Sequence, residues 1–156
     1  MTKKGLIISA SPCINSNSEA LATAFADGAR DAGREAGLVS LRGKTIDFCR
    51  GCFVCRKKQH CAIRDDGDEI CRKALTANVP VFAAPIYYYE LSGRLKTLLD
   101  RFNPLLPGNR AFTGAYLLSS AAEDEEYASR RAVSGVEGWV ECFERARLSG
   151  TVSGAV

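Results

Sequence analysis

The chain has 156 residues, which fits one domain and leaves no room for two independent hydrophobic cores. Apolar residues make up 46% and charged residues 25% of the sequence, which excludes a disordered chain and a membrane protein. The net charge of +3 is small and evenly scattered, so no nucleic-acid surface is expected. Because residues 1–4 do not resemble a signal peptide, we expect a cytoplasmic location.

Apolar periodicity in the first third of the chain predicts a strand, a polar loop, a helix and a second strand. Residues 5–10 form a short branched apolar run, typical of a strand buried on both faces. Ser16 and Glu19 have the spacing of a helix capping box, and apolar residues then recur at helical spacing through 21–36. A weaker apolar run at 38–46 indicates the second strand.

The middle of the chain repeats this order. Asp66 and Glu69 again have capping-box spacing and predict a helix, which is followed by an apolar run at 78–84 that predicts the third strand. Ser92 is then expected to cap a helix with an apolar stripe, and that helix should end before Pro104.

The last third supplies a strand at 111–120, a helix at 133–143 and a half-polar edge strand at 148–156. Five expected strands thus alternate with four helices, which predicts an α/β fold with an open, doubly wound parallel sheet and helices on both faces. We expect one domain, 1–156, with a cysteine-rich insertion loop at about 47–66.

Ligands of doubly wound sheets bind at the carboxyl ends of the strands, so the loops after the first, third and fourth strands are candidate sites. The first loop, 11–18, offers serine hydroxyls, asparagine amides and the free N–H groups of a helix N-terminus, which suit a phosphate. It lacks both the dinucleotide glycine fingerprint and a nucleoside triphosphatase phosphate loop. The alternative is that these side chains only cap the helix.

The other two loops are also unusual. Residues 85–91 include three consecutive tyrosines, which could bury against a flat ligand or, alternatively, pack in the core or against another subunit. Residues 119–122 are small and polar, which suits backbone contacts to a planar ligand. The three loops together predict a ligand site at the carboxyl edge of the sheet.

Four of the seven cysteines crowd into one short segment, which in a reducing compartment indicates a metal or redox site. Their spacing is x2, x2 and x5, and its opening resembles that of bacterial ferredoxins, which favours a 4Fe-4S cluster. Zinc fits less well, and free thiols or a thioredoxin-like dithiol remain open. His60 is either an alternative ligand or a solvated residue, whereas Cys71 and Cys142 are expected in the core. The predicted ligands are Cys49, Cys52, Cys55 and Cys61.

Motifs along nearly the whole chain resemble the flavodoxin-like NAD(P)H-dependent FMN reductase family, and within it the iron-sulfur flavoproteins most. The motifs are Ser11-Pro12 followed by Asn17-Ser18, the cysteine segment, and Pro85-Ile86-Tyr87 leading into Leu-Lys-x-x-Leu-Asp-Arg at 95–101. The resemblance implies a flavodoxin-like sheet of strand order 2-1-3-4-5. Such domains usually close with a helix after the fifth strand, and we expect this chain to lack that helix.

The resemblance also implies FMN as a cofactor. The residues implied for its phosphate are Ser11, Cys13, Ser16, Asn17 and Ser18. Those implied for its isoalloxazine ring are Pro85, Ile86, Tyr87, Tyr88 and Tyr89, with Ser119 and Ser120 nearby. Family members usually carry arginine where this chain has Cys13, so a charge-assisted phosphate contact is expected to be missing there.

The function we expect is electron transfer between a 4Fe-4S cluster and FMN and on to a small acceptor, with no side chain acting as acid or base. NAD(P)H or a ferredoxin-like protein is the expected electron donor, and the resemblance implies a homo-oligomer, either a dimer or a tetramer. One alternative is an NAD(P)H-dependent FMN or quinone reductase without a cluster. Another is a zinc-stabilised, non-catalytic binding module.

Overall fold

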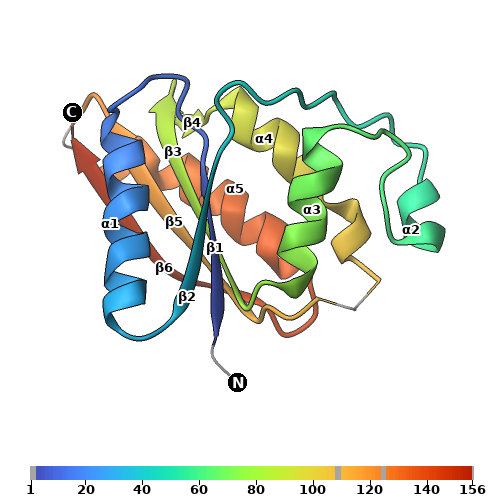
Figure 1. Ribbon diagram of the computed structural model, residues 1–156. Helices are drawn as coiled ribbons and strands as arrows, with labels where there is room; N and C mark the ends of the chain where they lie inside the picture. Colours follow the sequence, from blue (N-terminus) through green and yellow to red (C-terminus); the bar gives the residue numbers. More distant parts are fainter. Residues whose placement is uncertain (1–2, 108–109, 124–125, 156) are drawn as a thin grey trace.

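A computed structural model describes residues 3–107, 110–123 and 126–155 (Figure 1). The strands are β1 (Lys4–Ser9), β2 (Glu35–Ser40), β3 (Val79–Tyr87), β4 (Glu90–Leu91), β5 (Gly114–Ala121) and β6 (Arg147–Ala155). The helices are α1 (Asn17–Asp31), α2 (Val54–Lys58), α3 (Asp66–Thr76), α4 (Gly93–Asp100) and α5 (Arg130–Glu141). Short 3-10 helices are η1 (Asn103–Leu105) and η2 (Glu126–Ser129).

The sheet has the strand order β2-β1-β3-β5-β6, with every neighbouring pair parallel. This confirms the flavodoxin-like order 2-1-3-4-5, because β5 and β6 are the predicted fourth and fifth strands. The two-residue strand β4, which sequence patterns did not predict, pairs antiparallel with the end of β3. Figure 1 shows α1 on one face of the sheet and α3, α4 and α5 on the other.

Each face of the sheet has its own hydrophobic cluster. Ile7 of β1 packs with Ala22 and Ala26 of α1, whereas Leu6 and Ile8 join the larger cluster under α3, α4 and α5. Successive residues of β1 are therefore buried on opposite faces, which is why this strand is an unbroken apolar run. No helix that the structure describes is both long and apolar enough to cross a membrane.

The start of α1 agrees with the capping prediction, but its end does not. Ser16 is the N-cap, and its Oγ accepts a hydrogen bond from the Glu19 N–H at 3.2 Å. The helix ends at Asp31 instead of continuing through 36, because Gly33 adopts a positive φ of 71° that reverses the chain. The apolar residues after Gly33 consequently belong to β2, which ends at Ser40 instead of spanning 38–46.

Other boundaries also differ from the predictions. The N-cap of α3 is Asp65, whose side chain accepts from the Asp68 N–H, while the Asp66 side chain accepts from the Thr45 N–H. Strand β3 runs on to Tyr87, so the segment Pro85–Tyr87 is strand and not loop. Strand β6 lies at the sheet edge and is mostly exposed or half-buried, as its half-polar pattern predicted.

Candidate functional site

Three loops meet at the carboxyl edge of the sheet, as the sequence predicted (Figure 1). Strand β1 ends at Ser9, which pairs with Ala83 of β3, and β3 then continues so that Pro85 pairs with Ser120 of β5. The loop after β1 therefore begins beside the protruding ends of β3 and β5. Side chains from three distant parts of the chain are brought to one edge by the strand order alone.

The loop between β1 and α1 presents hydrogen-bond donors that the protein itself does not use. In the described part of the chain, the backbone N–H groups of Asn17 and Ser18 have no acceptor, and the buried Ser9 Oγ has no partner. Free N–H groups at a helix N-terminus, with the helix dipole behind them, favour an anion. The unused N–H groups and the hydroxyl at this loop therefore suit a phosphate.

The side chains predicted for that phosphate divide into two groups. Ser11 and Ser18 are buried, and the Ser11 Oγ accepts from the Cys13 N–H at 3.1 Å, so it shapes the loop. Ser16 caps α1, which is the structural role left open as the alternative. Cys13 and Asn17 are exposed and remain available to a ligand.

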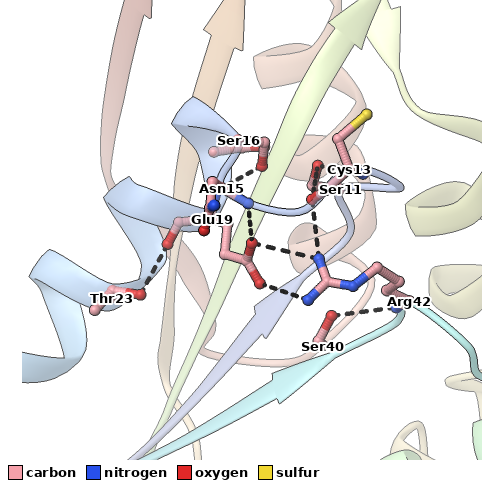
Figure 2. Close-up of polar contacts among 9 residues, drawn as sticks. Ser11, Cys13, Asn15, Ser16, Glu19, Thr23, Ser40 and Arg42 are labelled. Atoms are coloured by element: carbon pink, nitrogen blue, oxygen red, sulfur yellow. Dashed lines mark hydrogen bonds and ion pairs between the residues drawn. The ribbon is translucent and has the colours of Figure 1, made fainter.

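Arg42, which no sequence pattern indicated, follows β2 and reaches the same loop (Figure 2). Its guanidinium donates to the Cys13 carbonyl at 2.9 Å and to the Glu19 carboxylate at 3.1 Å. Hydrogen bonding to Arg42 is the largest reason why the pKa of Glu19 lies below its usual value. The strand order was the available signal, because β2 is next to β1 and so places the loop that follows β2 beside the 11–18 loop.

A hollow of about 200 Å³ lies where β3 and β5 end. This is below the ~300–1,000 Å³ of pockets that enclose whole ligands, so it suits one part of a ligand that stays partly open to solvent. Tyr88 and Tyr89 line it at positive φ values of 51° and 66°, and the Tyr89 hydroxyl donates to the Glu123 carboxylate at 3.3 Å. The full lining is Ile86, Tyr88, Tyr89, Ala121, Ala122, Glu123 and Ala128.

The three consecutive tyrosines are not core residues of this chain. Tyr87, Tyr88 and Tyr89 are 48%, 97% and 39% exposed. The interpretation that one of them packs in the core is therefore wrong. An exposed aromatic run at the end of a strand is available to stack on a flat ligand or on another protein surface.

The two serines at the end of β5 have different surroundings. The Ser119 Oγ lies 2.8 Å from the Ser153 Oγ, which in turn donates to the Ser129 Oγ at 2.9 Å. The Ser119 side chain is thus engaged with β6 and the start of α5. Ser120, the next residue of the strand, points to the opposite face of the sheet and is buried.

The four cysteines of the 47–66 loop line one common pocket, although they come from a loop, α2 and the segment before α3. Cys55 is buried, and burial is the largest reason why the pKa of its thiol is raised. The Cys49 sulfur accepts from the Gly51 N–H at 3.5 Å, and the Cys61 sulfur accepts from the Ile63 N–H at 3.4 Å. Backbone donors aimed at sulfur are among the groups that tune iron-sulfur clusters.

The cysteine pocket fits a soft-metal group by its chemistry but is not closed around one. Its volume is about 20 Å³, which is room for about one water molecule. Among the described residues, no three or more Cys, His, Asp or Glu side chains stand close enough together to hold a metal ion. The thiols would have to move closer to one another to bind a metal group.

Arg101 holds together the two ends of the 47–66 loop, which contains the four cysteines. Its fully buried guanidinium donates to the Asp47 carbonyl at 2.8 Å and the Ile63 carbonyl at 3.1 Å, and pairs with Asp65 at 2.7 Å. Burial acts to lower the pKa of Arg101, but hydrogen bonds to Asp65 and Cys61 outweigh it and raise the pKa overall. The last residue of the Leu-Lys-x-x-Leu-Asp-Arg motif thus anchors the loop to α4.

The remaining histidine and cysteines have other surroundings. His60 lies outside the cysteine pocket, with its Nδ1 3.1 Å from the Cys61 carbonyl and its Nε2 3.3 Å from Arg64. Cys71 is a core residue, as predicted. The prediction for Cys142 is wrong, because its thiol is exposed at the end of α5 and donates to the Gly138 carbonyl.

Comparison with known proteins gives the same fold and identifies the family. The chain is 35% identical over 101 residues to an iron-sulfur flavoprotein of Methanocaldococcus jannaschii, a match that covers 65% of this chain and 52% of that protein. It is also 35% identical over 94 residues to an iron-sulfur flavoprotein of Methanosarcina thermophila, covering 60% of this chain and 49% of the relative. The chain therefore spans about half the length of the curated relatives it matches.

Solved structures with the same fold are more distant in sequence. An NAD(P)H:quinone oxidoreductase from Methanothermobacter marburgensis has a TM-score of 0.69 at 17% identity, with 99% of this chain and 86% of that chain covered. An FMN-dependent NADH-azoreductase from Bacillus anthracis, in complex with FMN, has a TM-score of 0.70 at 15% identity, with 98% and 87% covered. The sequence profile of the NADPH-dependent FMN reductases matches residues 4–139, so the chain belongs to that family of flavin oxidoreductases.

Proposed function

We propose that this chain binds FMN at the carboxyl edge of its sheet, with the phosphate on the 11–18 loop and the ring against the β3 and β5 ends. The main support for this proposal is that the unused N–H groups of Asn17 and Ser18 lie at the same edge of the sheet as the tyrosine-lined hollow. FMN, when bound, supplies the electron-transfer chemistry. The protein's own residues bind the phosphate, orient the ring and partly exclude water.

The proposal extends to a 4Fe-4S cluster held by the four loop cysteines. Support comes from their common pocket, from the backbone donors at the Cys49 and Cys61 sulfurs, and from the buried cation of Arg101 beside Cys61. Two relatives of this chain are named iron-sulfur flavoproteins, and the match covers about half of each relative. A cluster would supply one-electron steps, while the loop would fix its position and charge surroundings.

The same proposal includes an electron donor and a second copy of the chain. NAD(P)H or a ferredoxin-like protein would deliver electrons, which pass on to a small acceptor. In Figure 1, α2 extends beyond α3, on the side of the molecule away from α1. A dimer or tetramer would let the cysteine pocket of one copy approach the flavin of another, and a strictly monomeric species in sedimentation at micromolar concentration would contradict this.

The positions of the thiols favour an alternative in which the chain holds no cluster. The thiols do not stand at metal-binding spacing anywhere in the described part of the chain. An NAD(P)H-dependent FMN or quinone reductase with free loop cysteines is therefore the second candidate. The two candidates share the flavin site and differ only in the cysteine pocket.

A single substitution separates the two cofactor sites. We expect Cys52→Ala, purified without oxygen, to lose iron and labile sulfide while it keeps FMN, because Cys52 lines the cysteine pocket and not the tyrosine hollow. Cys142→Ala is the matched control, since this exposed cysteine lies outside the loop. Equal iron in both variants would refute the cluster assignment, and loss of FMN from Cys52→Ala alone would refute the separation of the sites.

A further inference from the structure

An ion pair stands beside the loop proposed for the FMN phosphate. Arg42 contacts both oxygens of the Glu19 carboxylate, at 3.1 Å and 3.3 Å, and donates to the Cys13 carbonyl at 2.9 Å (Figure 2). The pair joins the first turn of α1 to the segment after β2. Neither residue was singled out by sequence spacing as a ligand contact.

Glu19 creates an electrostatic problem for a phosphate site. Its Oε2 accepts from the Asn15 N–H at 3.1 Å, so a carboxylate already occupies one backbone donor of the loop. Asn15 itself has a positive φ of 55°, so this hydrogen bond helps to hold an uncommon loop conformation. A phosphate arriving at the neighbouring N–H groups would meet a negative charge unless that charge is balanced.

Arg42 provides this balance with two contacts that act together. Its guanidinium forms a two-pronged contact with the carboxylate, which places a delocalised positive charge on the loop. Its bond to the Cys13 carbonyl also fixes the segment between Ser11 and Asn15. Position 13 is a cysteine, so the cation that contacts this segment of the loop is Arg42.

We propose that Arg42 is a positioning residue for phosphate recognition, which neutralises Glu19 and holds the Cys13 carbonyl so that the loop accepts a phosphate monoester. This inference rests on the proposed binding of FMN. It predicts that Arg42 matters for FMN, which carries the phosphate, and not for riboflavin, which has the same ring without it. It also predicts that most of the effect of removing Arg42 disappears when Glu19 loses its charge.

The test uses flavin-free full-length protein and measures dissociation constants for FMN and riboflavin by fluorescence quenching. We expect Arg42→Gln to weaken FMN binding by about tenfold, on the scale of one like-charge contact near a surface, and to leave riboflavin unchanged. The double variant Glu19→Gln/Arg42→Gln should regain most of the lost affinity. The matched control is Arg30→Gln, which breaks an exposed ion pair with Asp27 on the same helix and should change neither constant.

Three results would overturn the inference. Unchanged FMN affinity in Arg42→Gln would show that the residue plays no part, and equal loss of FMN and riboflavin would reduce its role to maintaining the fold. A double variant as weak as Arg42→Gln would mean that Arg42 does not act through Glu19. If the unsubstituted protein bound neither flavin, the proposed function itself would fail, and this inference with it.

Discussion

Arg101 is the residue whose removal we expect to disturb this molecule most. Its side chain is fully buried, pairs with Asp65 at 2.7 Å and donates to carbonyls on both sides of the cysteine loop. Removing one member of a buried ion pair leaves the other as an uncompensated charge. This lowers the free energy of unfolding far more than the loss of an exposed ion pair does. The pair thus ties the stability of the whole domain to the position of the cysteine loop.

We predict that Arg101→Gln lowers the free energy of unfolding by about 3–5 kcal/mol, measured by urea denaturation. The control is Lys96→Ala, which breaks the exposed pair Lys96–Asp100 on the same helix and should cost no more than about 0.5 kcal/mol. Losses of similar size in the two variants would contradict the assignment of Arg101 as an anchor.

Asp65, the ion-pair partner of Arg101, makes the stability of the fold depend on pH. Burial acts to raise the pKa of Asp65, but hydrogen bonds from Arg101 and from two backbone N–H groups outweigh it and hold the pKa below its usual value. The unfolded chain therefore binds a proton at Asp65 more readily than the folded chain does. The stability that Asp65 contributes is present above about pH 4 and is lost as the pH falls through its lowered, folded-state value.

We predict that the free energy of unfolding declines less steeply between neutral pH and pH 3 in Asp65→Asn than in the unsubstituted protein. The substitution also lowers stability at neutral pH, because Arg101 loses its counter-charge. Urea denaturation at a series of pH values measures both effects. Parallel pH profiles for the two proteins would show that Asp65 is not a main acid-sensitive group.

At the scale of elements, two helical glycines that look alike in the sequence have different surroundings. A Cβ at Gly28, within α1, would meet nothing within 4 Å. A Cβ at Gly67, in the first turn of α3, would lie 3.0 Å from the Ile46 side chain and 3.1 Å from the Asp65 carboxylate. Asp65 has no room to move because Arg101 holds it.

We predict that Gly28→Ala raises the free energy of unfolding by about 0.5–1 kcal/mol, through higher helix propensity and a less flexible unfolded chain. Gly67→Ala should instead lower it by about 1 kcal/mol, because overpacking outweighs the gain in propensity. Thermal or urea unfolding of both variants checks the difference. A gain at both positions would mean that the packing around Asp65 is looser than the structure shows.

Elements with local signals were predictable, and elements held by distant contacts were not. The hydroxyl of Ser16 caps α1 within three residues of chain, so its role was visible in the spacing. The end of α1 depended on the positive φ of Gly33, and apolar spacing alone does not reveal a backbone dihedral. Helix α2 was missed because it is only five residues long and is bounded by Phe53 and Gln59, both at positive φ.

For the whole molecule, strict alternation of strands and helices predicted a doubly wound parallel sheet, since right-handed crossovers leave few topologies. The order of its strands was predicted from the family resemblance. The sheet then placed the 11–18 loop beside the ends of β3 and β5, as expected. Contacts such as that of Arg42 with Cys13, across 29 residues, arise from this topology and have no local signature. The same holds for Arg101, which reaches 54 residues back to Asp47.

We propose that one chain holds both a flavin and an iron-sulfur cluster, and cofactor analysis of protein purified without oxygen measures both directly. We predict about one FMN, about four iron and about four labile sulfide per chain, and an absorption spectrum with both flavin and cluster bands. Stoichiometric FMN without iron or sulfide would contradict the cluster and leave the cluster-free reductase. Protein without FMN under the same conditions would contradict the proposed function.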